Sequence, residues 1–201
     1  MAYDCVMPAA GASSRMGAWK PLLPWRGTSL VEACVGAALG ACSRVLLVGG
    51  ERLAELASLF RGEPRVLVVA NPEWELGMLG SLQRALPLVE GGAFFCANAD
   101  MPLIESADYE ALEARYAILE ASGAPAAVFA AHGGGAGHPV LVPSSYIPEI
   151  LLLPPGGRMK RFLSGKPSCL VERGPGVLAD LDTPDDYERA ARLFPGRRFS
   201  R

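Results

Sequence analysis

The chain has 201 residues, of which 50% are hydrophobic and 20% are charged, and its formal net charge is −2. This length and composition are typical of one globular domain, and the lack of a basic excess argues against a nucleic-acid partner. No stretch of about 20 uncharged apolar residues is present, so we expect no membrane span and no membrane partner. The five cysteines include no CxxC pair, which argues against a zinc cluster and suits the reducing cytoplasm.

Short apolar runs alternate with amphipathic stretches over the first part of the chain. The apolar runs predict strands, and the amphipathic stretches between them predict helices. In chain order the expected elements are a strand at 4–9, a helix at 29–39, a strand at 44–48, a helix at 51–60, a strand at 65–69, a helix at 77–86, a strand at 93–96 and a helix at 106–119. This alternation predicts βαβ units in an α/β domain, with a mostly parallel sheet and helices on both of its faces.

The pattern loosens after residue 123. The elements expected there are a strand at 126–131, a flexible glycine segment at 133–137, a strand at 138–142, a basic helix at 158–163, a return to the sheet at 170–181 and a final helix at 183–193. Thr183 is the expected N-cap of that last helix, and Asp185 and Asp186 lie in its first turn, where negative charge is favourable. No linker divides the chain, so we expect a single domain.

Two loops follow predicted strands directly, one after Ala9 and one after Cys96. Right-handed crossovers bring the carboxyl ends of parallel strands to one edge of the sheet, which is where ligands bind in open α/β sheets. We therefore expect both loops to lie on the same rim and to form the ligand-binding site.

The first of these loops, AAGASSRMGAWK from Ala9 to Lys20, combines glycines with two cations. Glycines let backbone N–H groups approach phosphates closely, while Arg15 can fork onto phosphate oxygens and Lys20 supplies a mobile point charge. In a Walker A loop the lysine directly follows a glycine, but here two residues separate Gly17 from Lys20. Gly11 and Gly17 are too far apart for a dinucleotide fingerprint. The loop indicates phosphate binding, and a surface loop with two solvated cations is the alternative.

Carboxylates follow the second loop and recur near the end of the chain. Asp100 comes after a buried run and could hold Mg²⁺, which proteins bind through one or two carboxylates together with substrate phosphates. Its alternative role is to cap a helix ahead of Pro102. Asp180 and Asp182 alternate along the chain and share one face if the segment is extended. One of them could be a second Mg²⁺ ligand, and the other could cap the final helix.

Five motifs lie in order along nearly the whole chain. They are AAGASSRMGAWKPLLPWRG at 9–27, NPEWELGMLGSLQRAL at 71–86, NADMP at 98–102, GHPVLV at 137–142 and DLDTPDD at 180–186. With these motifs the chain resembles the molybdenum cofactor cytidylyltransferases, within the MobA-like nucleotidyltransferases that include the guanylyltransferase of the same pathway. The resemblance implies a single Rossmann-like, three-layer α/β domain of the nucleotide-diphospho-sugar transferase type over 1–201, with a mostly parallel mixed sheet. Its nucleotide-binding part would lie at about 1–122, its acceptor-binding part at about 123–182 and its C-terminal helix at about 183–194.

The resemblance also implies an Mg²⁺-dependent enzyme that transfers CMP from CTP to the terminal phosphate of molybdopterin and releases pyrophosphate. A molybdoenzyme or its chaperone would then be a further partner. The implied site consists of the catalytic residues Arg15, Lys20 and Asp100, the further candidate metal ligands Asp180 and Asp182, the acceptor-binding residues His138 and Lys160, and the nucleotide-binding residues Ala9, Ala10, Gly11, Ser13, Ser14, Gly17, Gly77 and Ser81.

Two features favour cytosine over guanine within this resemblance. The guanylyl branch usually has Gly-Gly where this chain has Ala10-Gly11, and it tends to have asparagines at the positions of Asp180 and Asp182. His138 belongs to a motif that marks the cytidylyl branch. It would face the pterin, or else act as a turn histidine bonded to the backbone.

The chain also departs from the family pattern. Ala99 stands where a glycine often precedes the metal-binding aspartate, and a side chain there disfavours a positive φ. Lys160 stands where an arginine is common, so Arg158 or Arg161 could take over a bidentate contact with phosphate.

The residues leave other functions open. The same fold could act on another NTP or on another phosphate acceptor, such as a sugar 1-phosphate or a cofactor precursor. A non-catalytic nucleotide-binding partner of a molybdoenzyme is a second alternative. A nicotinamide-dependent oxidoreductase is a third, and the chain lacks the compact glycine fingerprint that such an enzyme needs.

Overall fold

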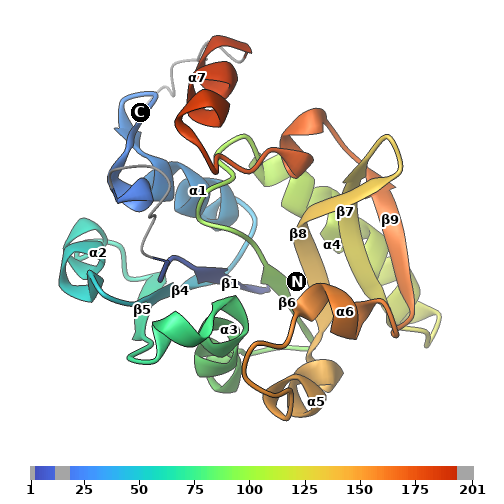
Figure 1. The fold of residues 1–201 in the computed structure, drawn as a ribbon. Coiled ribbons are helices and arrows are strands. Elements are labelled where there is room, and N and C mark those ends of the chain that lie inside the picture. Colours follow the sequence, from blue (N-terminus) through green and yellow to red (C-terminus); the bar gives the residue numbers. More distant parts are fainter. Residues whose placement is uncertain (1–2, 12–18, 194–201) are drawn as a thin grey trace.

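The computed structural model describes residues 3–11 and 19–193 and shows a twisted sheet with helices on both faces (Figure 1). The main sheet has seven strands in the order β5-β4-β1-β6-β8-β7-β9. Their bounds are β1 Asp4–Pro8, β4 Arg44–Gly49, β5 Val66–Ala70, β6 Ala93–Cys96, β7 Ala127–His132, β8 Gly135–Pro143 and β9 Ser168–Glu172. Strand β8 is antiparallel to both of its neighbours, and the other pairs are parallel. The expected mostly parallel mixed sheet is confirmed.

Helices connect the strands. The α-helices are α1 Leu30–Leu39, α2 Leu53–Leu59, α3 Met78–Ala85, α4 Ser106–Ala121, α5 Ile147–Leu151, α6 Met159–Leu163 and α7 Pro184–Leu193. Short 3-10 helices are η1 Lys20–Leu22, η2 Trp74–Leu76, η3 Leu86–Leu88, η4 Ser144–Tyr146 and η5 Pro175–Leu178. Among the residues that the structure describes, no helix is both long enough and apolar enough to cross a membrane.

Each face of the sheet has its own apolar core, because alternate side chains of a strand point to opposite faces. Met7 and Leu47 pack on one side with α1 and α4, whereas Val6 and Leu46 pack on the other with α3, α5 and α6. All four of these side chains are fully buried. The helices on both faces that the sequence predicted are therefore present, and helix α3 lies on the second face (Figure 1).

Local sequence signals explain where two of the helices begin. Ser29 accepts a hydrogen bond from the backbone N–H of Glu32, and the Glu32 carboxylate accepts one from the backbone N–H of Ser29. Thr183 and Asp186 form the same reciprocal pair at the start of α7. Both pairs satisfy N–H groups that have no partner within the helix. The N-cap predicted at Thr183 is confirmed.

Two expectations for the second half of the chain were wrong. Residues 135–137 belong to β8, because they pair with the end of β7 through a hairpin whose tip is Gly133 and Gly134, both at positive φ. Such a two-residue turn needs positive φ at both positions, which glycine adopts freely. The predicted return to the sheet at 170–181 is a strand only as far as Glu172, because the chain then turns into the 3-10 helix η5 at Pro175. Helix α5 and the small hairpin of β2 Pro24–Trp25 and β3 Thr28–Ser29 were not predicted.

Candidate active site

The two loops predicted to share a rim do lie together. Strands β1 and β6 are adjacent and parallel, so the segments that follow them leave the sheet at the same edge. A third segment joins them there, because the backbone N–H of Leu181 donates to the backbone carbonyl of Asp100 at 3.1 Å. The sheet topology thus brings the first loop, the Asp100 loop and the segment before α7 to one place.

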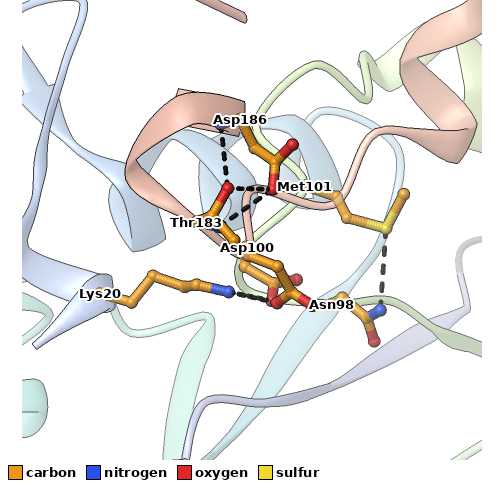
Figure 2. A network of polar contacts seen from close by, with 7 residues as sticks. Lys20, Asn98, Asp100, Met101, Thr183 and Asp186 are labelled. Carbon is orange, nitrogen blue, oxygen red and sulfur yellow. Dashed lines mark hydrogen bonds and ion pairs between the residues drawn. The ribbon is translucent and has the colours of Figure 1, made fainter. Parts of the chain in front are cut away.

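Lys20 connects all three segments through its ammonium group (Figure 2). Its Nζ atom donates to Oδ2 of Asp100 and to Oδ1 of Asp182, each at 2.8 Å. The Lys20 side chain is only 12% exposed, against 27% for Asp100 and 40% for Asp182. Burial by itself would lower the pKa of Lys20, but its hydrogen bonds to the two carboxylates outweigh burial and raise that pKa. Lys20 is therefore held as a cation between two anions.

The residues around Asp100 fit a divalent cation. Atom Oδ1 of Asp100 is buried and has no hydrogen-bond partner among the described residues, which is costly unless a ligand satisfies it. Asp182 supplies a second carboxylate close by, since both aspartates contact the same Lys20 nitrogen. The described part of the chain has no cluster of three or more His, Cys, Asp or Glu that could hold a metal. Two carboxylates are enough for Mg²⁺ when substrate phosphates complete the shell.

A cavity of about 340 Å³ opens beside this network. Eight of the predicted site residues line it, namely Ala9, Ala10, Gly11, Lys20, Gly77, Ser81, Asp100 and Asp182. Gly77 lies at the N-terminus of helix α3 with a φ of 104°, a conformation that favours glycine. The first N–H groups of a helix have no partner within it and favour anions. The cavity therefore combines a cation, two carboxylates and a helix N-terminus, which suits a polyphosphate with its metal. Residues 12–18, which include the predicted Ser13, Ser14, Arg15 and Gly17, lie outside the described part of the chain.

A second cavity, of about 570 Å³, adjoins the first and shares with it Pro8, Gly77, Met78 and Asn98. The two predicted acceptor residues, His138 and Lys160, line this second cavity together with Arg158. Most of the other lining residues are apolar, among them Leu79, Leu82, Phe129, Val140, Met159 and Leu163. The second cavity therefore suits a partly apolar molecule that also carries negative charge.

His138 fits both of the roles that the sequence left open. Its ring lines the second cavity, and its Nδ1 atom lies 3.4 Å from the backbone carbonyl oxygen of Cys96. Burial lowers the pKa of His138, although the Cys96 carbonyl and the charge of Asp180 act in the opposite direction. A neutral imidazole that donates from Nδ1 to Cys96 keeps Nε2 as an acceptor.

The structure separates the two aspartates that the sequence treated as one pair. Asp182 lines the first cavity and contacts Lys20, whereas Asp180 lines the second cavity. The protein atoms packed around Asp180 raise its pKa, and the nearby charge of Asp100 adds to this effect. Asp182 is therefore the better placed partner for Asp100 at a metal.

Two residues outside the predicted set also contribute to the first cavity. Trp74 lines it, and Asn71, which is buried, donates from its side chain to the Ser81 hydroxyl at 3.0 Å. Both belong to the motif NPEWELGMLGSLQRAL, of which only Gly77 and Ser81 were assigned. The position of Asn71 directly after the apolar run at 65–69 and Ala70, at the carboxyl end of an expected strand, is the sequence signal that could have identified it.

The chain is similar to known proteins over most of its length. Residues 5–170 match the MobA-like NTP transferase domain. The chain is 32% identical over 194 residues to the molybdenum cofactor cytidylyltransferase of Escherichia coli (strain K12), and the match covers 96% of this chain and 97% of that protein.

Solved structures show the same fold. A nucleotidyl transferase from Methanothermobacter thermautotroptrophicus matches with a TM-score of 0.79 and 24% identity, over 96% of this chain and 97% of that one. The crystal structure of Rv0371c from Mycobacterium tuberculosis H37Rv matches with a TM-score of 0.74 and 25% identity, over 98% of this chain and 100% of that one. The predicted α/β fold of the nucleotide-diphospho-sugar transferase type is confirmed.

Proposed function

The chain belongs to the MobA-like NTP transferase family, and from this premise we propose that it transfers CMP from CTP to the terminal phosphate of molybdopterin. Nucleotidyl transfer follows from the family, and the choice of CTP and molybdopterin is supported by the name of the E. coli relative. The single observation that carries the proposal is that the cavity with Lys20, Asp100 and Asp182 opens directly beside a second cavity with cationic side chains.

The reaction needs little acid–base chemistry. An oxygen of the acceptor phosphate attacks the α-phosphorus of CTP in line, a new P–O bond forms, and the bond to the β-phosphate oxygen breaks to release pyrophosphate. Because the attacking oxygen is already anionic, no strong general base is required. The protein accelerates such a step by holding the two phosphates in line and by neutralising charge.

The first cavity would hold the triphosphate. Lys20 would donate to the phosphate oxygens and stabilise the charge that grows on the leaving pyrophosphate. The free N–H groups at the start of helix α3, next to Gly77, would add neutral donors. Asp100 and Asp182 would hold Mg²⁺, which would supply neutralisation of the phosphate charge when it is bound.

The second cavity would hold the acceptor. Arg158 and Lys160 bring two positive charges to its lining, which suits a phosphate monoester. His138 would present Nε2 as an acceptor for an N–H group of the ligand. The apolar part of the lining keeps water away from the attacking phosphate, so that hydrolysis of CTP does not compete.

The proposal is tested by pyrophosphate release from CTP, GTP, ATP and UTP, each with and without molybdopterin. We expect release only when CTP and molybdopterin are both present. Release with another NTP would change the nucleotide assignment, and release with a sugar 1-phosphate in place of molybdopterin would change the acceptor. A lack of release under every condition, with CTP bound, would favour a non-catalytic nucleotide-binding protein.

A further inference from the structure

Gln83 joins helix α3 to a segment that is far away in the sequence. Its side-chain nitrogen Nε2 donates to the backbone carbonyl oxygens of Ile150 at 2.8 Å and Leu153 at 3.0 Å, and that of Leu151 lies 3.4 Å away. Gln83 is half-buried, and Ile150 is completely buried. One amide therefore holds the backbone at the end of helix α5.

The Ile150 carbonyl also accepts from the backbone N–H of Leu153 at 3.2 Å, whereas the Leu153 carbonyl has no donor other than Gln83 among the described residues. Helix α5 ends at Leu151, and the last carbonyls of a helix have no N–H partner within it. A buried carbonyl without a partner is costly, so the Gln83 amide stabilises this particular path of the chain. A methionine or leucine at position 83 would fill the same space and would leave these carbonyls without that donor.

The anchored segment leads directly to the acceptor cavity. Four residues beyond Leu153, the chain touches α3 again at Gly157, where an added Cβ would lie 2.7 Å from Cδ2 of Leu79 and 3.0 Å from the carbonyl oxygen of Pro154. Arg158 and Lys160 then follow at once and line the cavity. Helix α3 thus holds the segment at two points, Gln83 and Leu79, immediately before the two cations.

The same helix also lines the nucleotide cavity. Gly77, Met78 and Ser81, at the start of α3, are among the residues that surround it. Helix α3 therefore lines the nucleotide cavity with its first turn and, farther along, anchors the segment that leads to Arg158 and Lys160. The distance between the two phosphates depends on that anchoring, and misplacement by about 1 Å can cost about a hundredfold in rate.

We propose that Gln83 is a positioning residue for the phosphate acceptor. By fixing Arg158 and Lys160 relative to the nucleotide cavity, it determines where the acceptor phosphate is held. This inference rests on the proposed function, because it takes the second cavity as the acceptor site. Gln83 touches neither substrate. Its effect is on where the acceptor phosphate is held.

The test compares three variants at positions 83 and 84. Gln83→Met keeps the length of the side chain and removes the donor, whereas Gln83→Lys keeps an N–H donor at a similar reach. Arg84→Met is the matched control, because Arg84 is the next residue of α3 and its exposed ion pair with Glu73 lies away from the segment. For Gln83→Met we expect the KM for molybdopterin to rise about tenfold and the KM for CTP to stay within about twofold. Gln83→Lys should show a much smaller rise in the KM for molybdopterin than Gln83→Met, and Arg84→Met should have the KM values of the wild type.

A second readout needs no substrate. Trypsin cleaves after lysine and arginine, so native cleavage after Arg158 and Lys160 should be about tenfold faster in Gln83→Met than in Arg84→Met. Faster cleavage with an unchanged KM for molybdopterin would show that the anchor is only structural and would overturn the inference. An equal rise in both KM values, or unchanged cleavage, would also overturn it. If the wild-type chain does not use molybdopterin at all, the proposed function itself fails, and that result is separate from any difference between the variants.

Discussion

Lys20 donates to the Asp182 carboxylate at 2.8 Å although 162 positions separate the two residues in the chain. The same nitrogen lies 2.8 Å from Asp100, so one cation contacts both carboxylates and offsets one of their two negative charges. A metal that takes the place of Lys20 between these two oxygens would leave the lysine to contact the triphosphate.

The first prediction concerns metal affinity in the absence of nucleotide. Lys20→Met removes the competing cation and leaves two carboxylates whose mutual repulsion a divalent ion relieves, so we expect Mn²⁺ to bind about tenfold more tightly. The loss of the free Mn²⁺ signal in electron paramagnetic resonance measures this directly. Lys166→Met is the control, because Lys166 pairs with Glu149 outside both cavities, and it should not change Mn²⁺ binding. Weaker Mn²⁺ binding by Lys20→Met would contradict the competition between lysine and metal.

The second prediction concerns turnover. Asp100→Asn keeps the size of the side chain and removes its charge, so we expect CTP turnover to fall by a factor of at least about 10² while the fold is retained. Asp185→Asn is a matched control on the same side of the molecule, since Asp185 lies in the first turn of α7 and not in either cavity. Steady-state rates and circular dichroism on both variants check the outcome. Retained Mg²⁺-dependent pyrophosphate release in Asp100→Asn would remove Asp100 from the metal site.

The third prediction concerns pH and His138. Burial lowers the pKa of His138 below its ordinary value of 6.5, so below that pH the unfolded chain binds a proton that the folded chain does not. The contribution of neutral His138 to the free energy of unfolding is therefore fully present above about pH 6.5, and it is lost as the pH falls toward the lowered pKa.

Urea unfolding of the wild type and of His138→Gln measures this contribution. We expect the wild type to lose more stability than the variant between about pH 7.5 and about pH 5.5, by less than about 1.4 kcal/mol per pH unit. Groups away from His138 titrate equally in both proteins, so the difference reports His138 together with Asp180, whose pKa the charge of His138 lowers. An identical pH dependence of the two proteins would mean that the histidine is not held neutral.

The fourth prediction concerns Gly50 and Gly36, at which alanine is expected to have opposite effects on stability. A Cβ at Gly50 would lie 2.6 Å from Cγ of Trp74 and 2.8 Å from the carbonyl oxygen of Ala10, so Gly50→Ala must displace the wall of the nucleotide cavity. We expect a loss of about 1–3 kcal/mol in stability and a higher KM for CTP. Gly36 lies within helix α1 with open space around it, so Gly36→Ala should gain about 0.5–1 kcal/mol and leave the KM unchanged. Thermal unfolding shows whether each substitution raises or lowers the stability. An unchanged stability of Gly50→Ala would show that Trp74 moves freely.

Sequence signals were reliable where they act over a few residues. The strand at 93–96 was predicted with the bounds of β6, and the start of α1 after Ser29 follows from a capping box of adjacent residues. The glycines at 133–137 misled the prediction, because glycine is common both in flexible loops and in tight hairpins. Pairing with β7 decides between these alternatives, and pairing is a property of the folded sheet.

The sequence by itself determined the elements, the α/β class and the motifs of a phosphate-binding site, because apolar periodicity, helix caps and motif spacing are properties of short segments. Only the tertiary structure decided that Asp182 and not Asp180 shares Lys20 with Asp100, and that Gln83 holds the chain ahead of Arg158. Those relationships join residues from distant segments, and their geometry arises only when the helices pack on the sheet. Packing therefore decided which of the predicted aspartates and lysine meet.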